Sequence, residues 1–459
     1  MNSIYANICK KMLLPLGDIA TQQRVMQLHR FYRESQWWDR ERLIDYQNKQ
    51  LQETLKIAYH EVHFYQELYD RYNVKLSNIR TVDDLPLLPI ATKEMLKAAY
   101  PKYCTRKTKW PSQEYSTSGS SGKPFAVRVD NLTMSHARAL MFMRANFSGW
   151  KIGDPFLQTG MTLNRGFVKR MKDLFLRTQY VSAFNLSNEI LDGYLGIIES
   201  KKLAFIMGYP GSVYCLALRA SEVGMSPRMK GIVTWGDNVY KHYRSIIERQ
   251  FQCQVTDTYG CGEGIQVAAQ CGLNNGIYHI FMPHVAVEII DDGQPVTPGK
   301  TGDIILTRLD AGVMPLIRYQ IGDIGSKSHL KDCPCGRELE MMESIEGRDT
   351  DIIITPNGNK LIVHFFTGIF EYYHSVDTFR VLQEKMGEIT IEIVPQPDFK
   401  NEHWEKIKQE ILSKGDPDLK LHLNVVSEIP IGPSNKRRFV ISRLANSYNS
   451  LNRSNANNN

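Results

Sequence analysis

The sequence has neither a long apolar run nor a disulfide framework. No segment approaches the roughly 20 consecutive apolar residues of a transmembrane helix, and the short run MLLPL after Lys10 and Lys11 contains Pro15. Eight cysteines in 459 residues are too few to cross-link a chain of this length. We therefore expect a cytoplasmic protein with reduced thiols and no transmembrane segment, although residues 12–19 could touch a membrane surface.

A strong charge of one sign is also absent. The chain carries 56 Lys and Arg against 49 Asp and Glu, which gives a formal net charge of +7. Its basic residues are scattered, and the short run from Lys436 to Arg438 is typical of a solvated surface. This distribution argues against a nucleic-acid partner and is compatible with a small anionic substrate. The sequence leaves the oligomeric state open, a homodimer being one alternative.

The chain does contain enough apolar residues for a large core. Hydrophobic residues make up 42% of it, and its length predicts two or three domains. Residues 40–73 repeat apolar side chains at the three- and four-residue steps of a buried helix face. Short β-type runs alternate with helical ones between residues 150 and 330. We predict an α/β fold, with a large multi-sheet N-terminal domain and a small mobile α+β C-terminal domain.

The pattern changes near residue 345. Asn357-Gly358 lies between two apolar runs, which predicts a hairpin. Residues 387–394 and 419–426 alternate like strands, and residues 401–415 have the pattern of a helix closed by Gly415. We predict a large domain over 1–345, with a helical lead-in over 1–100, and a small domain over 346–445. The Asn- and Ser-rich tail, 446–459, is predicted to be disordered.

Residues 115–124, YSTSGSSGKP, combine hydroxyls, glycines and one lysine. Such small residues let the backbone turn tightly and present N–H and O–H donors to an anion, and the lysine adds a point charge. These properties indicate a phosphate-binding loop. It is not a Walker loop, because Pro124 stands where that motif needs a Ser or Thr that opens a helix.

Four later segments combine tight turns with charged residues. DTYGCGEG at 257–264 contains Glu263, RYQIGDIG at 318–325 contains Asp323, EGRDTD at 346–351 contains Arg348, and NKRRFVIS at 435–442 contains Lys436. A single residue of this kind is more often a turn or surface residue. The information lies in their common order along the chain.

TSGSSGKP and these four segments, in this order, resemble the motifs of the adenylate-forming synthetases, and among them the phenylacetate–coenzyme A ligase family. PLLPIATKEML at 86–96 and GYPGSVY at 208–214 are similar to that family's helical lead-in and acyl-pocket segment. The resemblance covers roughly residues 40–445. It implies an enzyme that uses ATP and Mg²⁺ to activate a carboxylate.

The resemblance also implies roles for individual residues. Glu263 would hold Mg²⁺ on the phosphates, and Lys436 would stabilise the attack of the substrate carboxylate on the α-phosphorus. The residues expected to grip the β- and γ-phosphates are Thr117, Ser118, Gly119 and Lys123.

Other residues would bind the nucleoside and the acid. Tyr259, followed by Gly260, would stack on adenine, while Asp323 and Arg348 would contact the ribose hydroxyls. The residues expected in an aryl or short-acyl pocket are Tyr209, Pro210, Ser212 and Gly236.

A second group of residues has the composition of a structural zinc site. Cys271 is followed eight positions on by His279, and CPCG later supplies Cys333 and Cys335. One His and three Cys form the donor set of a closed tetrahedral site. Some relatives in the resembled family carry a zinc at matching positions. The alternative is free thiols beside a surface histidine.

The chain departs from the family pattern at several positions. Gly262 stands where a Ser or Thr usually touches the α-phosphate, and Thr350 stands where the hinge carboxylate is expected. Asn435 replaces the glycine before the lysine, and Asn also adopts left-handed backbone conformations. WGDN at 235–238 replaces the usual GE near adenine. None of these changes abolishes ATP binding on physical grounds.

The largest departure follows Asp351. The chain continues PNGNKLIVHFFTGIFEYY, similar to the branch of capsular polysaccharide biosynthesis proteins, and lacks the family's segment for the pantetheine tunnel. Coenzyme A as the acceptor is therefore an analogy. Our hypothesis is an AMP-forming ligase that transfers an acyl group to coenzyme A. The alternatives are transfer to an amine, sugar or carrier protein, and a non-catalytic nucleotide-binding scaffold.

Overall fold

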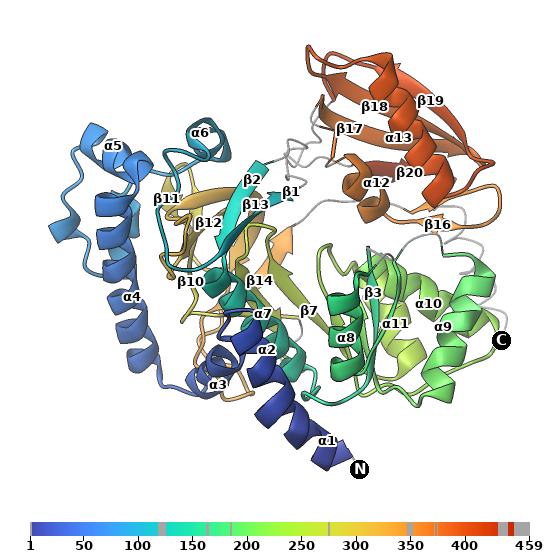
Figure 1. The fold of residues 1–459 in the computed structure, drawn as a ribbon, viewed down its shortest axis with the longest axis horizontal. Coiled ribbons are helices and arrows are strands. Elements are labelled where there is room, and N and C mark those ends of the chain that lie inside the picture. Colours follow the sequence, from blue (N-terminus) through green and yellow to red (C-terminus); the bar gives the residue numbers. More distant parts are fainter. Residues whose placement is uncertain are drawn as a thin grey trace.

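The computed structural model describes residues 2–117, 125–161, 165–183, 186–273, 276–346, 352–370, 372–373, 375–429 and 439–444. Figure 1 shows a large body built on a long sheet and a smaller C-terminal body, coloured orange to red. The α/β class with a smaller α+β C-terminal part, predicted above, is confirmed. Among the helices in these ranges, none combines the length and apolarity needed to cross a bilayer.

Helices dominate the first hundred residues. They are α1 (Asn2–Ile8), the π-helical turn η1 (Cys9–Leu13), α2 (Leu14–Ala20), α3 (Val25–Ser35), α4 (Arg40–Glu61), α5 (His63–Arg71), η2 (Leu76–Asn78), η3 (Val82–Leu87) and α6 (Lys93–Ala99). Helix α4 begins where the Asp39 carboxylate accepts a hydrogen bond from the Arg42 N–H. The helix expected over 40–73 is two helices, because the backbone is extended at Val62.

Twelve strands form one mixed sheet in the order β11-β10-β12-β13-β14-β9-β8-β7-β6-β5-β3-β4. The parallel part consists of β3 (Phe156–Gly160), β4 (Thr178–Ser182), β5 (Phe205–Gly208), β6 (Gly231–Thr234) and β7 (Val255–Gly260). The antiparallel part consists of β8 (Gln266–Gln270), β9 (Tyr278–Ile280), β10 (Val285–Asp291), β11 (Gln294–Pro295), β12 (Thr301–Arg308), β13 (Tyr319–Lys327) and β14 (Met341–Glu346).

Strand β7 joins the two parts of this sheet. It runs parallel to β6 and antiparallel to β8. Ligands of open α/β sheets bind outside the carboxyl ends of parallel strands, where the strand order changes. The turn after β7 lies outside the carboxyl end of a parallel strand, the edge at which such sheets bind ligands.

The parallel part is covered by helices. These are α7 (Asn131–Phe147), α8 (Phe167–Leu176), α9 (Asn188–Ser200), α10 (Pro210–Glu222) and α11 (Lys241–Phe251). Strands β5 and β6 are buried along their whole length, as expected for strands covered on both faces. A separate hairpin of β1 (Ser112–Thr117) and β2 (Phe125–Asp130) packs on the antiparallel part through Phe125, Val127 and Val129.

The smaller body has its own core. Its elements are β15 (Ile353–Ile354), β16 (Lys360–Leu361), α12 (Val363–Phe370), β17 (Val376–Lys385), β18 (Glu388–Pro395), α13 (Asn401–Lys414), β19 (Lys420–Val425) and β20 (Val440–Ser442). The hairpin predicted at Asn357-Gly358 is confirmed by the pairing of Ile353 with Leu361. Four strands form the sheet β19-β18-β17-β20. Helix α13 ends at Gly415 as predicted, and a Cβ there would lie 2.7 Å from the Ile411 carbonyl oxygen.

The smaller body contacts α10 of the larger one. A Cβ on Gly211 would lie 2.9 Å from a methyl group of Ile362, so this position in the first turn of α10 has room only for glycine. The predicted boundary between the two domains lies between residues 345 and 346, and residues 347–351 just after it lie outside the described ranges. The domain limits therefore remain predictions.

Candidate active site

The hydroxyl- and glycine-rich loop connects β1 to β2. Thr117 pairs with Phe125, so the chain leaves and re-enters the hairpin at adjacent positions. Ser118, Gly119 and Lys123 lie outside the described residues, as does the side chain of Thr117. The ring of Phe125 is stacked with that of Tyr319, with centroids 6.4 Å apart. This contact fixes the end of the loop beside the start of β13.

Glu263 lies in the turn between β7 and β8. Its side chain is buried, and one carboxylate oxygen accepts a hydrogen bond of 2.8 Å from the Tyr319 hydroxyl. Gly264 follows with φ of +86°, a conformation that glycine adopts without strain. A buried carboxylate with few neutralising partners is suited to a cation.

Lys93 lies beside Glu263, and the motifs did not indicate it. Its ammonium nitrogen lies 3.9 Å from the same oxygen of Glu263, and the side chain is only 10% exposed. The start of α6 is tied to β13, since the Ala91 N–H donates to the Arg318 carbonyl. Lys93 belongs to the segment PLLPIATKEML, which we predicted only as a helical lead-in. A lysine in the first turn of a helix, where positive charge is unfavourable, is the signal that could have identified it.

Tyr259 and Asp323 come together although 64 residues separate them. The Tyr259 hydroxyl donates a hydrogen bond of 2.8 Å to an oxygen of the Asp323 carboxylate. Burial, followed by the charge of Asp323, raises the pKa of Tyr259, so the phenol stays protonated and remains a donor. Gly260 has no room for a side chain, because a Cβ would lie 2.8 Å from the Ile265 carbonyl oxygen.

The residues expected in the acyl pocket come from two neighbouring strand ends. The ring of Tyr209, which precedes Pro210 at the start of α10, contacts that of Trp235 at 6.4 Å. Gly236 follows Trp235 with φ of +87°. The Ser212 hydroxyl is buried, donates to the Tyr209 carbonyl and lies 2.7 Å from the Thr159 hydroxyl. Ser212 thus shapes the turn that presents Tyr209.

Arg144 of α7 also reaches this region, and no motif indicated it. Its guanidinium lies 4.8 Å from the centre of the Trp235 ring and donates to Gln266. Burial lowers the pKa of Arg144 to about 10, with the charge of Asp257 acting in the opposite direction. The arginine remains cationic at neutral pH and places a positive charge beside the predicted pocket.

Three further predicted site residues lie outside the described ranges. They are Arg348, Thr350 and Lys436. The strand that follows Lys436, β20, pairs in parallel with β17 of the small sheet. Strand β14 leads toward Arg348 from the large sheet.

The predicted zinc ligands do come together. The donor atoms of Cys271, His279, Cys333 and Cys335 all lie within 4.8 Å of one another. The Cys271 and Cys333 sulfurs are 3.5 Å apart, and the His279 Nε2 atom lies 3.3 Å from the Cys271 sulfur. Zn–S bonds of about 2.3 Å and a Zn–N bond of about 2.0 Å require donor separations of about 3.5–3.8 Å in a tetrahedron, so this donor set fits zinc.

The histidine of this cluster already has the protonation state that a metal requires, whereas a cysteine ligand must lose its proton on binding. Burial, with a smaller effect of Arg337, lowers the pKa of His279 to about 4, which leaves the imidazole neutral. Burial raises the pKa of Cys271 to about 12, whereas hydrogen bonds from Arg337 outweigh burial and lower the pKa of Cys335. The cluster links the segment after β8 to the loop before β14. A metal here would hold the two segments together.

Comparison with family models identifies the C-terminal part. Residues 353–443 match the model described as the CapK C-terminal domain. The matched range includes the four-stranded sheet, α12 and α13.

Two curated relatives cover most of the chain. A phenylacetate–coenzyme A ligase of Thermus thermophilus is 24% identical over 406 residues, which are 83% of this chain and 88% of that protein. Protein CapK of Staphylococcus aureus is 24% identical over 416 residues, 88% of this chain and 90% of that one.

A solved structure shows the same fold. A 2-hydroxyisobutyryl-CoA ligase, in complex with 2-HIB-AMP and CoA in the thioesterification state, superposes with a TM-score of 0.59. The two chains are 18% identical, and the match covers 92% of this chain and 96% of the other. The resemblance inferred from the motifs is confirmed by these comparisons. The chain therefore has the fold of the adenylate-forming ligases, is a relative of the phenylacetate–coenzyme A ligases and of protein CapK, and carries a CapK C-terminal domain.

Proposed function

We propose that this chain is an ATP-dependent, AMP-forming ligase that adenylates a small carboxylic acid. The observation that carries the proposal is the buried Glu263 carboxylate, bonded to Tyr319 and close to Lys93 in the turn after β7. This turn lies outside the carboxyl end of β7, at the edge of the parallel strands where open α/β sheets bind ligands. The relatives with ligase names support the same reaction class.

In this proposal the triphosphate lies between the β1–β2 loop and Glu263. The loop residues that would donate to the β- and γ-phosphates are Thr117, Ser118, Gly119 and Lys123. Mg²⁺ held by Glu263 would neutralise the charge of the leaving pyrophosphate. The Lys93 ammonium, close to the same carboxylate, would add a second positive charge near the phosphates.

The nucleoside would bind at Tyr259 and Asp323. The bond from the Tyr259 hydroxyl orients the Asp323 carboxylate, which would accept hydrogen bonds from the ribose. Tyr259 would stack on adenine beside Gly260, and Arg348 would contact the ribose from the linker to the small domain. These assignments rest on the motif order and on the Tyr259–Asp323 contact.

The chemistry would proceed in two steps. An oxygen of the substrate carboxylate attacks the α-phosphorus, the bond to pyrophosphate breaks, and Lys436 stabilises the charge that develops. The small domain, 346–445, would then rotate about Thr350 relative to the large domain, 1–345, and withdraw Lys436. An acceptor nucleophile attacks the acyl carbonyl, loses its proton and displaces AMP.

The acid and the acceptor are the finer parts of the proposal. Tyr209, Pro210, Ser212 and Gly236, with Trp235 alongside, suit an aryl or short-acyl acid. Coenzyme A is the first candidate acceptor, because a ligase with this fold was solved with CoA. An amine, sugar or carrier protein is the alternative, favoured by the CapK C-terminal domain. A non-catalytic nucleotide-binding scaffold is the remaining alternative.

Zinc bound by Cys271, His279, Cys333 and Cys335 would be structural. Four protein donors complete a tetrahedral site and leave no position for substrate. We place the reaction in the cytoplasm, which supplies ATP and keeps thiols reduced; all eight cysteines are free.

The reaction class can be tested by identifying the nucleotide product. Purified protein is incubated with ATP, Mg²⁺ and a panel of aryl, short-chain and amino acids, with and without coenzyme A. We expect acid-dependent formation of AMP and pyrophosphate, and a thioester of mass equal to the acid plus coenzyme A minus water. AMP formation that hydroxylamine stimulates and coenzyme A does not would select the alternative acceptors. ADP as the product, or no turnover with any acid, would contradict adenylation.

A further inference from the structure

The N-terminal helical segment exposes a continuous apolar stripe. Ile4, Ile8, Met12, Leu16 and Ile19 are 41–75% exposed and follow one another at steps of four, four, four and three residues. A step of four residues is longer than one α-helical turn, so side chains at such steps would gradually move around the axis of a regular α-helix. The π-helical turn η1 holds more residues per turn and removes part of this drift. The five side chains therefore share one face.

The opposite face of the same segment is attached to the protein. The Tyr5 hydroxyl donates a 2.7 Å hydrogen bond to the Phe175 carbonyl, and Cys9 is fully buried. Ala6 lies so close to Gly153 that a Cβ on the glycine would be 2.8 Å away. The inner face of the helical segment packs in the core cluster around Trp150. The apolar stripe on its outer face therefore points to solvent.

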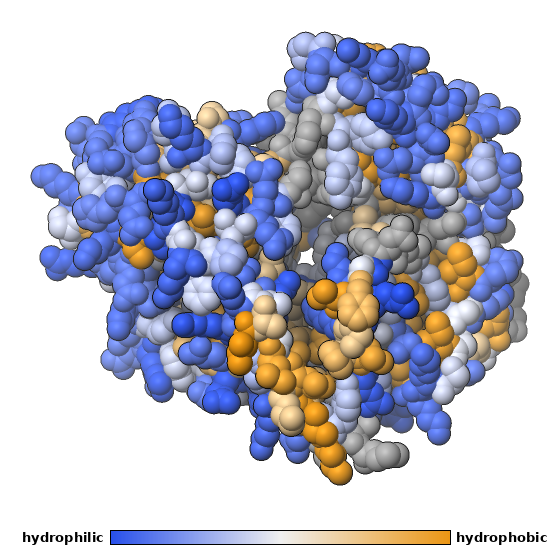
Figure 2. Space-filling model, in the orientation of Figure 1, coloured by the Kyte–Doolittle hydropathy of each residue, from blue (hydrophilic) through white to orange (hydrophobic). Residues whose placement is uncertain are grey.

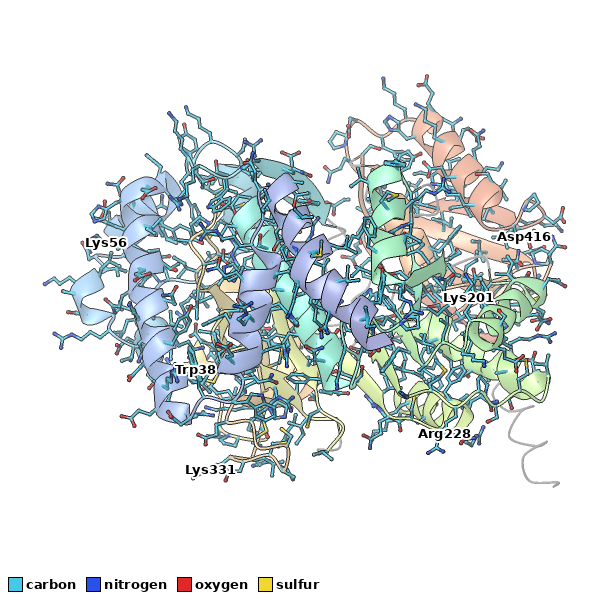
Figure 3. All side chains as sticks on the ribbon, turned by 60° about the horizontal axis from the view of Figure 1, so that its bottom comes forward. Trp38, Lys56, Lys201, Arg228, Lys331 and Asp416 are labelled. Atoms are coloured by element: carbon cyan, nitrogen blue, oxygen red, sulfur yellow. The ribbon has the colours of Figure 1, made fainter. Side chains whose placement is uncertain are left out.

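Helix α8 extends the apolar surface. It contacts η1, and it exposes Phe167, Val168 and Leu174 by 66–77%. Figure 2 shows these hydrophobic residues as one orange area over α1, α2 and α8, while most of the remaining visible surface is blue. Figure 3 brings the same N-terminal helix to the front of the molecule. Exposed apolar areas of this kind mark surfaces that are covered in use.

Positive charge surrounds this surface. The helices α1–η1–α2 and α8 carry the basic residues Lys10, Lys11, Lys169 and Arg170. Their two acidic residues are already bonded. Asp18 accepts a hydrogen bond from the Met26 N–H, and Asp173 forms a bidentate ion pair with Arg165.

A cavity beside α8 continues the positive surface. Its volume is about 1140 Å³, and its lining includes Arg165, Arg170, Arg177 and Lys201 but a single carboxylate, Asp173. Lys201 is labelled in Figure 3. Leu174 lines the cavity and is also part of the exposed apolar surface, so the two features are adjacent.

We propose that α1–η1–α2 and α8 form a docking surface for an anionic lipid bilayer. Amphipathic helices bind membrane interfaces by inserting apolar side chains between head groups while basic residues meet lipid phosphates. The cavity beside α8 would accommodate a phosphate-bearing head group. A second copy of the chain is disfavoured, because a two-fold dimer through this face would bring the same basic residues together. The proposal is independent of the adenylation chemistry.

Vesicle co-sedimentation tests this surface. The full chain is mixed with vesicles of phosphatidylcholine alone or of phosphatidylcholine with phosphatidylglycerol. We expect at least about tenfold stronger partitioning to the anionic vesicles, falling with salt, because several basic residues contribute. The double variant Leu16→Glu/Phe167→Glu should lose binding, and Lys169→Glu/Arg170→Glu should lose the preference for anionic lipid. The control Met386→Glu, at an exposed apolar residue elsewhere, should bind like the wild type.

Thermal unfolding and solution mass accompany the binding measurement. The variants should unfold at the wild-type temperature, because the substituted side chains are exposed. Absence of wild-type binding to any vesicle, or unchanged binding by the Leu16→Glu/Phe167→Glu variant, would overturn the proposal. A wild-type dimer that this variant converts to a monomer, without vesicle binding, would overturn it in favour of a second copy.

Discussion

At the scale of single residues, the candidate site depends on contacts between distant parts of the sequence. The motifs identified Glu263 and Asp323, but their partners Tyr319 and Tyr259 were assigned other roles or none. Lys93 and Arg144 were missed entirely. A motif describes a short stretch of chain, whereas a hydrogen-bond partner 56 residues away depends on how the sheet folds. The motifs thus singled out the two acidic residues as candidates, but they could not predict the partners that surround them.

The Tyr319–Glu263 hydrogen bond gives the first residue-level prediction. Tyr319→Phe leaves a buried carboxylate without its donor, which should cost about 1–3 kcal/mol of unfolding free energy and lower the adenylation rate. The matched control is Tyr69→Phe, since the buried Tyr69 hydroxyl has no hydrogen-bond partner in the described structure. Denaturant unfolding of both variants should show a loss only for Tyr319→Phe. Equal effects would show that the bond is unimportant.

Buried histidines predict a dependence of stability on pH. Burial lowers the pKa of His29 to about 4 from its ordinary value of 6.5. The unfolded chain therefore binds the proton more tightly, and stability falls as the pH decreases from 6.5 toward 4, by up to about 3 kcal/mol for this group. His29→Gln should flatten this part of the profile of melting temperature against pH, and His422→Gln, at an exposed position, should not. A profile for His29→Gln that parallels the wild type would disprove the assignment.

At the scale of elements, hairpins and helices with clear local signals were predictable. Asn357-Gly358 predicted the β15–β16 hairpin, and the periodicity of residues 401–415 predicted α13. The break at Val62 was not predicted, because the apolar period continues through it into α5. The order of the twelve strands was also inaccessible. It depends on pairings such as β9 with β14, which lie about sixty residues apart.

The cluster of Cys271, His279, Cys333 and Cys335 connects segments that are far apart in the sequence, and zinc binding there would have a testable effect on stability. We expect about one zinc per chain by mass spectrometry under native conditions, since the four donors fit a closed site. Cys335→Ser should remove the metal and destabilise the protein by several kcal/mol, within the range of about 10 kcal/mol for structural zinc. Cys253→Ser, outside the cluster, should retain both metal and stability. Two results together would contradict a zinc site: no zinc in the wild type, and the same melting temperature for Cys335→Ser. The cluster would then consist of free thiols beside a histidine.

At the scale of the whole molecule, the proposed adenylation needs residues from both the large and the small body. The large sheet presents Glu263, Tyr259 and Asp323, while Lys436 comes from the segment before β20 of the small sheet. The motif order predicted this division of labour, but Arg348, Thr350 and Lys436 lie outside the described residues. Their cooperation with Glu263 is therefore a question for measurement.

The exchange of labelled pyrophosphate into ATP measures adenylation alone, before any acceptor is needed. Once AMP formation has identified the acid, we expect the wild type to exchange pyrophosphate into ATP only when that acid is present. Lys436→Ala should reduce it about 10²–10³-fold while ATP binding persists, as expected for the loss of a preorganised charge. The neighbouring Arg437→Ala is the control and should exchange at nearly the wild-type rate. Undiminished exchange by Lys436→Ala, or no acid-dependent exchange by a wild type that binds ATP, would contradict the account.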